Sequence, residues 1–309
     1  MVLIYTISDT YKSQIVACLL NNLIAYTDYF LMPILIQTIQ SFMKNLSKLF
    51  IALFFVAGSL NNSSAQTIEM GMVPDSSSAL QFNYNRFLIS DSDLSAFSGN
   101  YDFRYRHALN SKFNLLAELN FSHYDNSFAE ADNALGNLFL GAQYKLSQKA
   151  NKQSSVNFGL YIPTAGEEAV INAFTNIYDI PKYYQDVLTI HGSYSSFFYF
   201  DSGFRVGIQL GSDLSIPTED DAEAELFAKY GLSVMYTTEI NLYFQSEFLG
   251  YAIITEDDGF GDNSFHSYSF AAGHDFGSIR LAAAYKNYFD DLFIGDFNGV
   301  FGLQLMKDF

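Results

Sequence analysis

Tryptophan is absent from the sequence, and cysteine occurs once, at Cys18. Residues 66–309 therefore contain no cysteine, which excludes a disulfide framework and a cysteine-based metal site in that region. Basic residues are also scarce, because 16 Lys and Arg stand against 33 Asp and Glu and give a net charge of −17. So acidic a chain argues against nucleic acid as a partner, since nucleic acids bind basic surfaces.

Long apolar runs are missing after residue 65, where no stretch approaches the length of about 18 residues that a membrane-spanning helix needs. We therefore predict no transmembrane helix in this part of the chain. Aromatic residues are abundant instead, with 22 Tyr and 31 Phe. Such a surplus suits the aromatic belts that membrane proteins place at the two membrane–water interfaces.

The stretch MKNLSKLFIALFFVAGSLNNSSAQ looks like the beginning of a chain, although 42 residues precede it. Lys44 and Lys48 form a basic head, a short apolar run follows, and small residues close the stretch. This order is typical of a secretory signal peptide, and a buried core helix is the alternative. We expect residues 43–65 to be a signal peptide, translation to start at Met43, and residues 1–42 to be a mis-annotated upstream extension.

Apolar and polar residues alternate with a period of two from residue 79 onward. In FRVGIQLGSD, for example, Val206 and Ile208 fall on one face, and Arg205 and Gln209 fall on the other. Alternation of this kind predicts β-strands with one apolar face. Twelve such stretches lie near 79–89, 98–108, 112–124, 134–147, 153–162, 183–200, 202–214, 224–237, 239–252, 265–276, 278–289 and 299–309.

The length and spacing of these stretches indicate the fold class. Most have ten or more residues, whereas strands of soluble proteins usually have about 5–6 and tilted membrane strands about 9–11. Very short links, near Asn110, Asp201, Thr238 and Gly277, alternate with longer ones. We predict an all-β, transmembrane, antiparallel up-and-down β-barrel of about 12 strands over residues 79–309, in the outer membrane of a Gram-negative bacterium. Residues 66–78 are expected to be a flexible periplasmic lead-in.

The C-terminal sequence GVFGLQLMKDF ends in Phe309, with Leu305, Leu303 and Phe301 at two-residue steps before it. It resembles the terminal signal by which the barrel-assembly machinery recognises outer-membrane proteins, although Lys307 departs from the usual apolar or aromatic choice. The expected partners are therefore this machinery, outer-membrane lipid and a small-molecule solute.

One local stretch carries a family resemblance. LGNLFLGAQYKL followed by SSVNFGLYIPTAGEE resembles the outer-membrane family named for the meta-pathway of phenol degradation, which is close to the fatty-acid-transporter-like barrels. Asn137 stands where that family usually has Asp, and Ala165 is inserted before the glycine. The resemblance implies passage of small, often hydrophobic or aromatic compounds. The matching residues are Gly136, Gly141, Tyr144, Pro163, Thr164, Gly166 and Glu167.

Projecting the alternation inward predicts a polar lumen. Charged groups on a lipid-facing strand face cost about 2–4 kcal/mol at the bilayer midplane, so these residues should face the interior. If these charged side chains are spread around a water-filled lumen, they select solutes and the barrel is an open channel. If they pair across the lumen, they plug it and the barrel is a closed structural or surface-binding one. The predicted lumen residues are Asp102, Arg104, Arg106, Glu118, Asn120, Gln143, His191, Arg205, Gln209, Lys229, Gln245, Glu247, Arg280 and Lys286.

Two runs of carboxylates, TEDDAEAE (218–225) and TEDDGFGD (255–262), stand out in the longer links. Carboxylate oxygens are ligands for Ca²⁺ and Mg²⁺, so divalent cations are possible partners, but neither run has EF-hand spacing and a solvated acidic face is the favoured interpretation. Link 163–182 is unusually apolar, and it could be a plug, a surface-lying segment or an oligomer contact. We predict no cofactor.

A lipid hydrolase is a remote alternative. His123 and His266 each have a serine beside them in the sequence, but neither stretch matches the motif of the outer-membrane phospholipase. A hydrolase needs a nucleophile, a histidine and an orienting partner close in space. We therefore predict that the protein is not an enzyme and that it has no catalytic residues.

Overall fold

The computed structural model describes residues 68, 70, 73, 75–89, 97–126, 129–166, 176–218, 223–255, 264–289 and 297–309. The expected signal peptide and upstream extension lie outside the described residues, as do half of the acidic run 218–225 and most of the run 255–262. None of the helices in the described part of the chain is both long and apolar enough to cross a membrane.

The described chain is almost entirely β-structure, with one short 3₁₀ helix, η3 (Ile177–Lys182). The strands are β1 (Ala79–Ile89), β2 (Gly99–Ala108), β3 (Phe113–Asn126), β4 (Ala129–Leu135), β5 (Leu138–Lys149), β6 (Lys152–Ile162), β7 (Val187–Tyr199), β8 (Phe204–Pro217), β9 (Glu225–Thr237), β10 (Leu242–Ile253), β11 (Ser264–Asp275), β12 (Ile279–Tyr288) and β13 (Phe297–Asp308).

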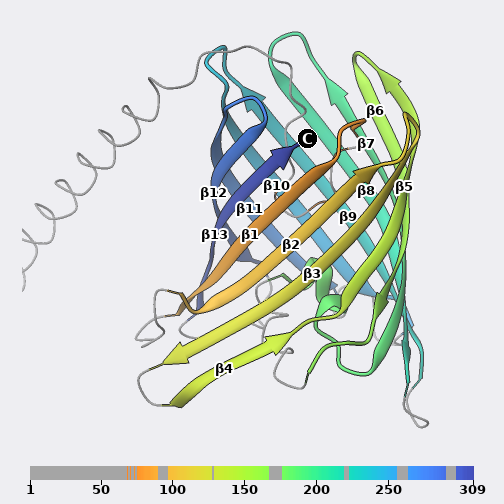
Figure 1. Cartoon of the computed structure of the whole chain (residues 1–309), viewed down its shortest axis with the longest axis vertical. Coiled ribbons are helices and arrows are strands. Elements are labelled where there is room, and N and C mark those ends of the chain that lie inside the picture. The colour runs from red at the N-terminus through yellow and green to blue at the C-terminus, as the bar shows by residue number, and fades with distance from the viewer. Residues whose placement is uncertain are drawn as a thin grey trace, which may run out of the picture. The chain divides into compact units, whose positions relative to one another are not determined.

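These strands form one antiparallel sheet that closes on itself (Figure 1). Each strand pairs with its neighbours in sequence, except that β4 and β5 both pair with β3 and not with each other. β1 pairs with both β2 and β13, so the first and last strands meet. The closing register brings Ala79 opposite Asp308. A closed barrel leaves no sheet edge, which is the condition for β-structure to cross a membrane. The predicted transmembrane, up-and-down barrel is confirmed.

Strand β4 is the one described strand that the alternation did not predict as a separate element. Residues 125–133 were expected to be an outer loop, and 134–147 one strand. Instead, β3 continues to Asn126. The chain then turns back, so that β4 pairs with the last residues of β3 and β5 pairs with the first half of β3. Since β4 and β5 occupy one place beside β3, the wall has twelve places around it. The segment AEADNAL has low strand propensity and pairs through its backbone, so it carries little strand signal.

The two faces of each strand have opposite character. Along β2, for example, Phe103 and Tyr105 are exposed on the outside, whereas Asp102, Arg104 and Arg106 are buried in the interior. Exposed Leu, Phe, Val and Tyr side chains cover the outer surface of the other strands in the same way. An apolar exterior around a polar interior is the reverse of a soluble protein and suits a wall that contacts lipid.

The connections differ between the two ends of the barrel. The links 109–112, 150–151, 200–203, 238–241 and 276–278 are short, and we call the end that they share the turn end. Gly203 and Gly277 have positive φ angles of 80° and 90°, which a residue without Cβ adopts readily in tight turns. The chain leaves β13 at this end too (Figure 1). The longer connections lie at the opposite, loop end.

Candidate functional site

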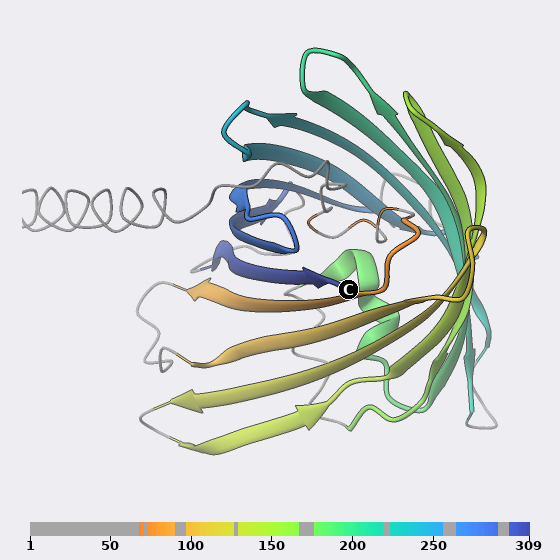
Figure 2. The same cartoon turned by 45° about the horizontal axis from the view of Figure 1, so that its top comes forward.

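The lumen is occupied by part of its own chain. Helix η3 belongs to the long connection between β6 and β7 at the loop end, and Figure 2 shows it inside the ring of strands. Its residues Ile177, Tyr178, Asp179, Pro181 and Lys182 are all buried. For residues 176–182 the structure therefore selects the plug among the three interpretations of this apolar link.

Asp179 joins η3 to two cations on the wall. Its carboxylate oxygen Oδ2 lies 3.1 Å from Nη2 of Arg104 on β2, and Oδ1 lies 2.9 Å from Nζ of Lys229 on β9. Both cations also contact wall carboxylates, because Arg104 Nε lies 3.5 Å from Glu118 Oε2 and Lys229 Nζ lies 3.3 Å from Asp213 Oδ2. A single carboxylate of the plug thus bridges two separate ion pairs of the wall.

Lys182 makes the complementary contact at the other end of η3. Its ammonium nitrogen lies 2.8 Å from Glu118 Oε2 and 3.7 Å from Asp102 Oδ1, and its side chain is only 1% exposed. It also lies 3.1 Å from Asp179 Oδ2, so the two charges of the plug touch each other. The plug therefore presents an anion to the wall cations and a cation to the wall carboxylates.

Both plug charges are stabilised in their ionised forms. Burial disfavours the charged carboxylate of Asp179, but Lys182, Lys229 and Arg104 together outweigh this effect and hold its pKa well below the ordinary value. Burial and Arg104 oppose the charge on Lys182, yet the carboxylates of Asp102, Asp179 and Glu118 prevail and raise its pKa. The plug therefore stays a charged pair at neutral pH.

A short stretch of wall between β4 and β5 fixes the base of the plug. The Asn137 side chain donates to the carbonyls of Pro181 at 2.8 Å and Tyr184 at 2.7 Å, and its backbone N–H donates to the carbonyl of Lys182 at 2.7 Å. A Cβ on Gly136 would stand 2.7 Å from the same Lys182 carbonyl. The missing side chain of Gly136 therefore allows the plug backbone to lie against the wall.

A second segment enters from the turn end. Ile68, Met70 and Val73 are buried, and the Glu247 carboxylate on β10 accepts from the N–H of Ile68 at 2.8 Å. Arg106 donates to the Val73 carbonyl at 2.6 Å. These described residues of 66–78 thus lie inside the barrel, whereas we expected a flexible lead-in outside it. Their backbone polar groups find partners among the lumen charges, which explains the difference.

Little empty space remains around the plug. A hollow of about 40 Å³ lies between η3 and the wall. A cavity of about 150 Å³ is needed to hold a ring as small as benzene, so this hollow has room only for a few water molecules. Aromatic side chains of Phe139, Tyr161 and Tyr178 share its lining with five of the predicted lumen residues, namely Arg104, Glu118, His191, Gln209 and Lys229. Between η3 and these lining residues there is no room for a solute as large as benzene.

The structure places all fourteen predicted lumen residues in the barrel interior. Thirteen are buried, and Glu118, whose side chain is 18% exposed, contacts Lys182. They do not form one site. Asp102, Arg104, Glu118, His191, Gln209 and Lys229 lie around η3. Arg106, Glu247 and Arg280 hold the N-terminal segment or the turn end. Whether any of them contacts a solute stays a prediction.

The residues of the family resemblance have structural partners near the plug. Thr164 donates from its hydroxyl to the Gly136 carbonyl at 2.9 Å, and its N–H donates to Asn137 Oδ1 at 2.8 Å. Gly141 lies opposite Gly159, and a Cβ on either would collide with the Phe139 ring. The remaining described motif residues are Tyr144, which packs on Phe113, together with Pro163 and Gly166, and they lie apart from the lumen or at its rim. Glu167 lies outside the described residues.

The two histidines considered for catalysis do not face their serine neighbours. Ser122 and Ser267 are buried on the inner face, whereas the histidine beside each of them in the sequence lies on the outer face. His123 Nδ1 lies 2.9 Å from Asn133 Oδ1, and His266 packs its ring on Phe248. Successive residues of a strand point to opposite sides, so sequence neighbours cannot form such a pair.

The structure assembles a different Asp–His–Ser arrangement, which reasoning from the sequence missed. His191 Nδ1 lies 2.6 Å from Asp213 Oδ1, and His191 Nε2 lies 3.1 Å from Ser193 Oγ. Asn157 also donates to Ser193 Oγ at 3.1 Å. The sequence could have predicted part of this arrangement, because His191 and Ser193 are two residues apart on one strand and therefore lie on the same face. Asp213 joins them only through the pairing register of β7 and β8, which the sequence does not show.

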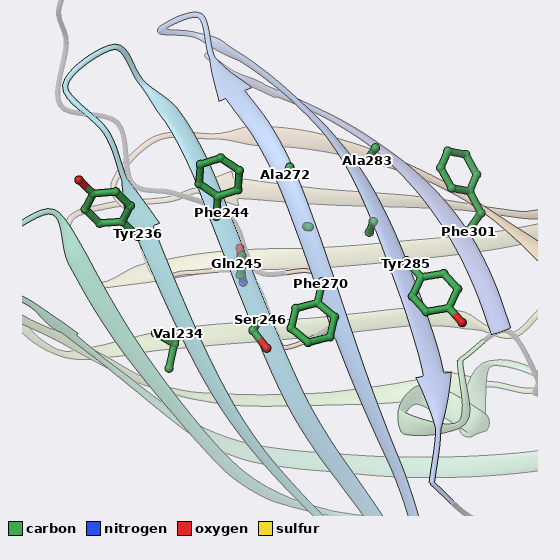
Figure 3. Close-up of a pocket in the computed structure, with 12 residues that line it drawn as sticks. Val234, Tyr236, Phe244, Gln245, Ser246, Phe270, Ala272, Ala283, Tyr285 and Phe301 are labelled. Atoms are coloured by element: carbon green, nitrogen blue, oxygen red, sulfur yellow. The ribbon is translucent and has the colours of Figure 1, made fainter. Parts of the chain in front are cut away.

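A larger hollow of about 530 Å³ lies on the outer surface across β9 to β13 (Figure 3). Ala272 and Ala283, which pair across β11 and β12, leave a low floor between the rings of Phe244, Phe270 and Tyr285. The strand pairing is continuous beneath this hollow. It is therefore a depression in the lipid-facing wall and not a passage through it.

Metal ligands do not gather in the part of the chain that the structure describes. No group of three or more His, Cys, Asp or Glu side chains among these residues is arranged to hold a metal ion. The densest carboxylates of both acidic runs fall outside the described ranges, so divalent-cation binding at the loops stays a prediction.

Comparison with known proteins supports the architecture. No family model and no curated protein matches the chain. A solved outer-membrane channel from Pseudomonas putida F1 is similar in structure, with a TM-score of 0.56 and 13% identity over 80% of this chain and 100% of that one. The NanC porin gives a TM-score of 0.48 and 8% identity over 75% of this chain and 98% of that one. The KdgM porin gives a TM-score of 0.47 and 7% identity over 75% and 99%.

Proposed function

We propose that this protein is an outer-membrane channel for small solutes, in a state that η3 keeps closed. One observation carries the proposal: two segments of the chain lie in the lumen, one from each end, among the buried side chains of the wall. A wall of twelve strands lies between the filled barrels of eight strands and the open porins of sixteen. Displacing a connecting segment would therefore leave a continuous space.

The nature of the contacts supports a movable plug. Asp179 and Lys182 hold η3 through charged groups, and such groups can be rehydrated when the segment leaves. An apolar plug would expose its surface to water at a large cost. In the proposed orientation the turn end faces the periplasm and the loop end, which carries η3, faces outward.

The finer identity of the solute is also proposed. The resemblance at residues 135–168 points to small, hydrophobic or aromatic compounds. The lumen supports a ring-bearing solute, because Phe139 and Tyr161 both meet His191 edge-on, with centroids 5.9 and 6.2 Å away. It does not favour a wholly apolar one, since Arg104 and Lys229 line the same space.

Conductance in planar bilayers tests the proposal. We expect the full chain to show rare openings and a variant lacking residues 176–182 to show frequent ohmic steps. A second variant that also lacks 68–78 tells whether the N-terminal segment obstructs the opened lumen. If both variants fold and remain silent, the protein is a closed structural or surface-binding barrel with acidic outer loops.

Hydrolysis is a second candidate because Asp213, His191 and Ser193 have the bonding order of a catalytic triad. Ser193 Oγ would attack an ester carbonyl while His191 takes the hydroxyl proton and passes it to the departing alcohol as the ester C–O bond breaks. Water would then hydrolyse the acyl-serine and regenerate Ser193. A fluorophosphonate probe tests this function, since it labels an activated serine covalently. Absence of labelling at Ser193, in the full chain and in the variant lacking 176–182, would reject it.

A further inference from the structure

The wall around η3 carries two groups of charge that the plug satisfies separately. Arg104 and Lys229 form a cationic group, and Asp179 lies between them at 3.1 and 2.9 Å. Asp102 and Glu118 form an acidic group, and Lys182 lies between them at 3.7 and 2.8 Å. These wall residues are buried or nearly so, and the two groups are adjacent, because Arg104 Nε lies 3.5 Å from Glu118 Oε2.

The two plug charges are themselves in contact, with 3.1 Å between Lys182 Nζ and Asp179 Oδ2. An adjacent carboxylate and ammonium group is the chemical pattern of a zwitterion. The plug adds an aromatic ring to this pair, because the ring centre of Tyr178 lies 4.6 Å from Lys229 Nζ and its hydroxyl donates to Gln209 at 3.1 Å. Ring, carboxylate and ammonium thus occupy one place in the lumen.

We propose that the wall site now occupied by η3 binds a small zwitterion of the α-amino-acid type, preferably one with an aromatic side chain, and that η3 is its built-in competitor. This inference rests on the channel function proposed above. The binding residues would be Arg104 and Lys229 for the carboxylate, Asp102 and Glu118 for the ammonium group.

Other solute classes satisfy the wall less completely. An uncharged solute at this site replaces neither charge of the plug, so the wall cations keep only their ion pairs with Glu118 and Asp213. A simple anion replaces Asp179 but leaves Asp102 and Glu118 without the cation that Lys182 supplies. A simple cation replaces Lys182 but leaves Arg104 and Lys229 facing each other. Only a solute with both charges reproduces the described contacts.

Block of channel current measures this selectivity. The full chain carrying Asp179→Asn provides an open lumen, and three probes share a phenyl ring and differ only in charge. They are L-phenylalanine, 3-phenylpropionate and 2-phenylethylamine at pH 7. We expect L-phenylalanine to block the current at a concentration about tenfold lower than either analogue, the ratio expected from one charged hydrogen bond.

Wall variants in the same background assign the two halves of the site. Glu118→Gln should make 3-phenylpropionate as effective as L-phenylalanine, and Arg104→Gln should do the same for 2-phenylethylamine. If Arg104→Gln fails to fold, Lys229→Gln provides the same test of the carboxylate half of the site with 2-phenylethylamine. The matched control is Lys145→Gln, which removes a buried lumen lysine whose charged neighbours are Arg106 and Asp75, and should keep the preference.

The outcomes separate this inference from the function on which it rests. Equal block by the three probes, or no block, in a conducting channel overturns the zwitterion site and leaves the channel standing. The zwitterion site is likewise overturned if neither wall variant changes the order of the probes. Absence of current in every folded variant overturns the channel function, and the zwitterion site with it.

Discussion

Replacing Asp179 with asparagine should open the channel. The substitution keeps the size of the side chain and removes the charge that bridges Arg104 and Lys229. Removing one partner of a buried ion pair costs about 3–5 kcal/mol when the remaining charge has no other partner. Here the remaining cations keep Glu118 and Asp213. The loss is therefore closer to that of a charged hydrogen bond, about 2 kcal/mol.

This energy acts on the docking of η3 and not on the folding of the barrel, because the wall strands keep all of their backbone pairing. A loss of about 2 kcal/mol multiplies the ratio of undocked to docked plug by about 30. Single-channel recording of the full chain at neutral pH should show a corresponding rise in open probability. The conductance of each opening should stay the same, since the wall is unchanged.

A matched control separates the plug from the general effect of removing a lumen carboxylate. Asp275 pairs with Arg280 at 3.4 Å near the turn end, and Asp275→Asn should leave the open probability unchanged. If Asp179→Asn folds but changes open probability no more than Asp275→Asn does, η3 is not held by its charges and the reasoning fails.

The remaining predictions concern the same closure and the wall. Gly136→Ala should raise open probability without any change of charge, because the new Cβ would stand 2.7 Å from the Lys182 carbonyl oxygen. Single-channel recording checks this, and an unchanged open probability would contradict the docking geometry. Asn137→Asp removes two donated hydrogen bonds to the plug and keeps the acceptor for Thr164, so protease cleavage near residues 176–182 should become faster while the barrel stays intact. The pKa of Asp179 is depressed in the docked state, so the closure should be fully present above the ordinary carboxyl pKa of about 3.9 and weaken only as pH falls through the lower pKa of docked Asp179. Open probability, recorded as a function of pH, should therefore be flat from about pH 5 to 8. Leu232→Lys, on the exposed outer face of β9, should lower the unfolding free energy in vesicles by about 2–4 kcal/mol in a urea titration, and a negligible loss would argue against lipid contact there.

The wall was predictable because lipid and lumen impose opposite chemistry on alternate residues. Arg205 and Gln209 point inward for the same reason that Val206 and Ile208 point outward, and no knowledge of strand partners is needed to see it. The period of two therefore located twelve stretches that became wall strands. It could not locate β4, whose pairing with β3 lies in backbone hydrogen bonds.

The site was predictable only in part. Alternation indicates which face a side chain occupies, but not which strand lies opposite. The pairing of His191 with Asp213 depends on register, and the approach of Lys182 to Asp102 depends on a loop that returns into the lumen. The apolar character of link 163–182 was a signal that this loop is unusual. It carried no information about which wall charges the loop would meet.

The two inward segments share apolar contacts and differ in their charged ones. Met70 and Val73 share an apolar cluster with Phe197, Leu249 and Tyr178 of η3, so releasing either segment would expose part of that surface to water. Helix η3 combines apolar packing, in which Ile177 contacts Phe227 and Tyr251, with buried ion pairs to the wall. Buried ion pairs are a weak means of stabilisation, since well-packed apolar residues in the same place are often as stable or more so. A segment held in this way gives up stability and keeps the ability to exchange its contacts for water or solute. The charges of η3 are therefore better explained by reversible closure than by permanent filling of the barrel.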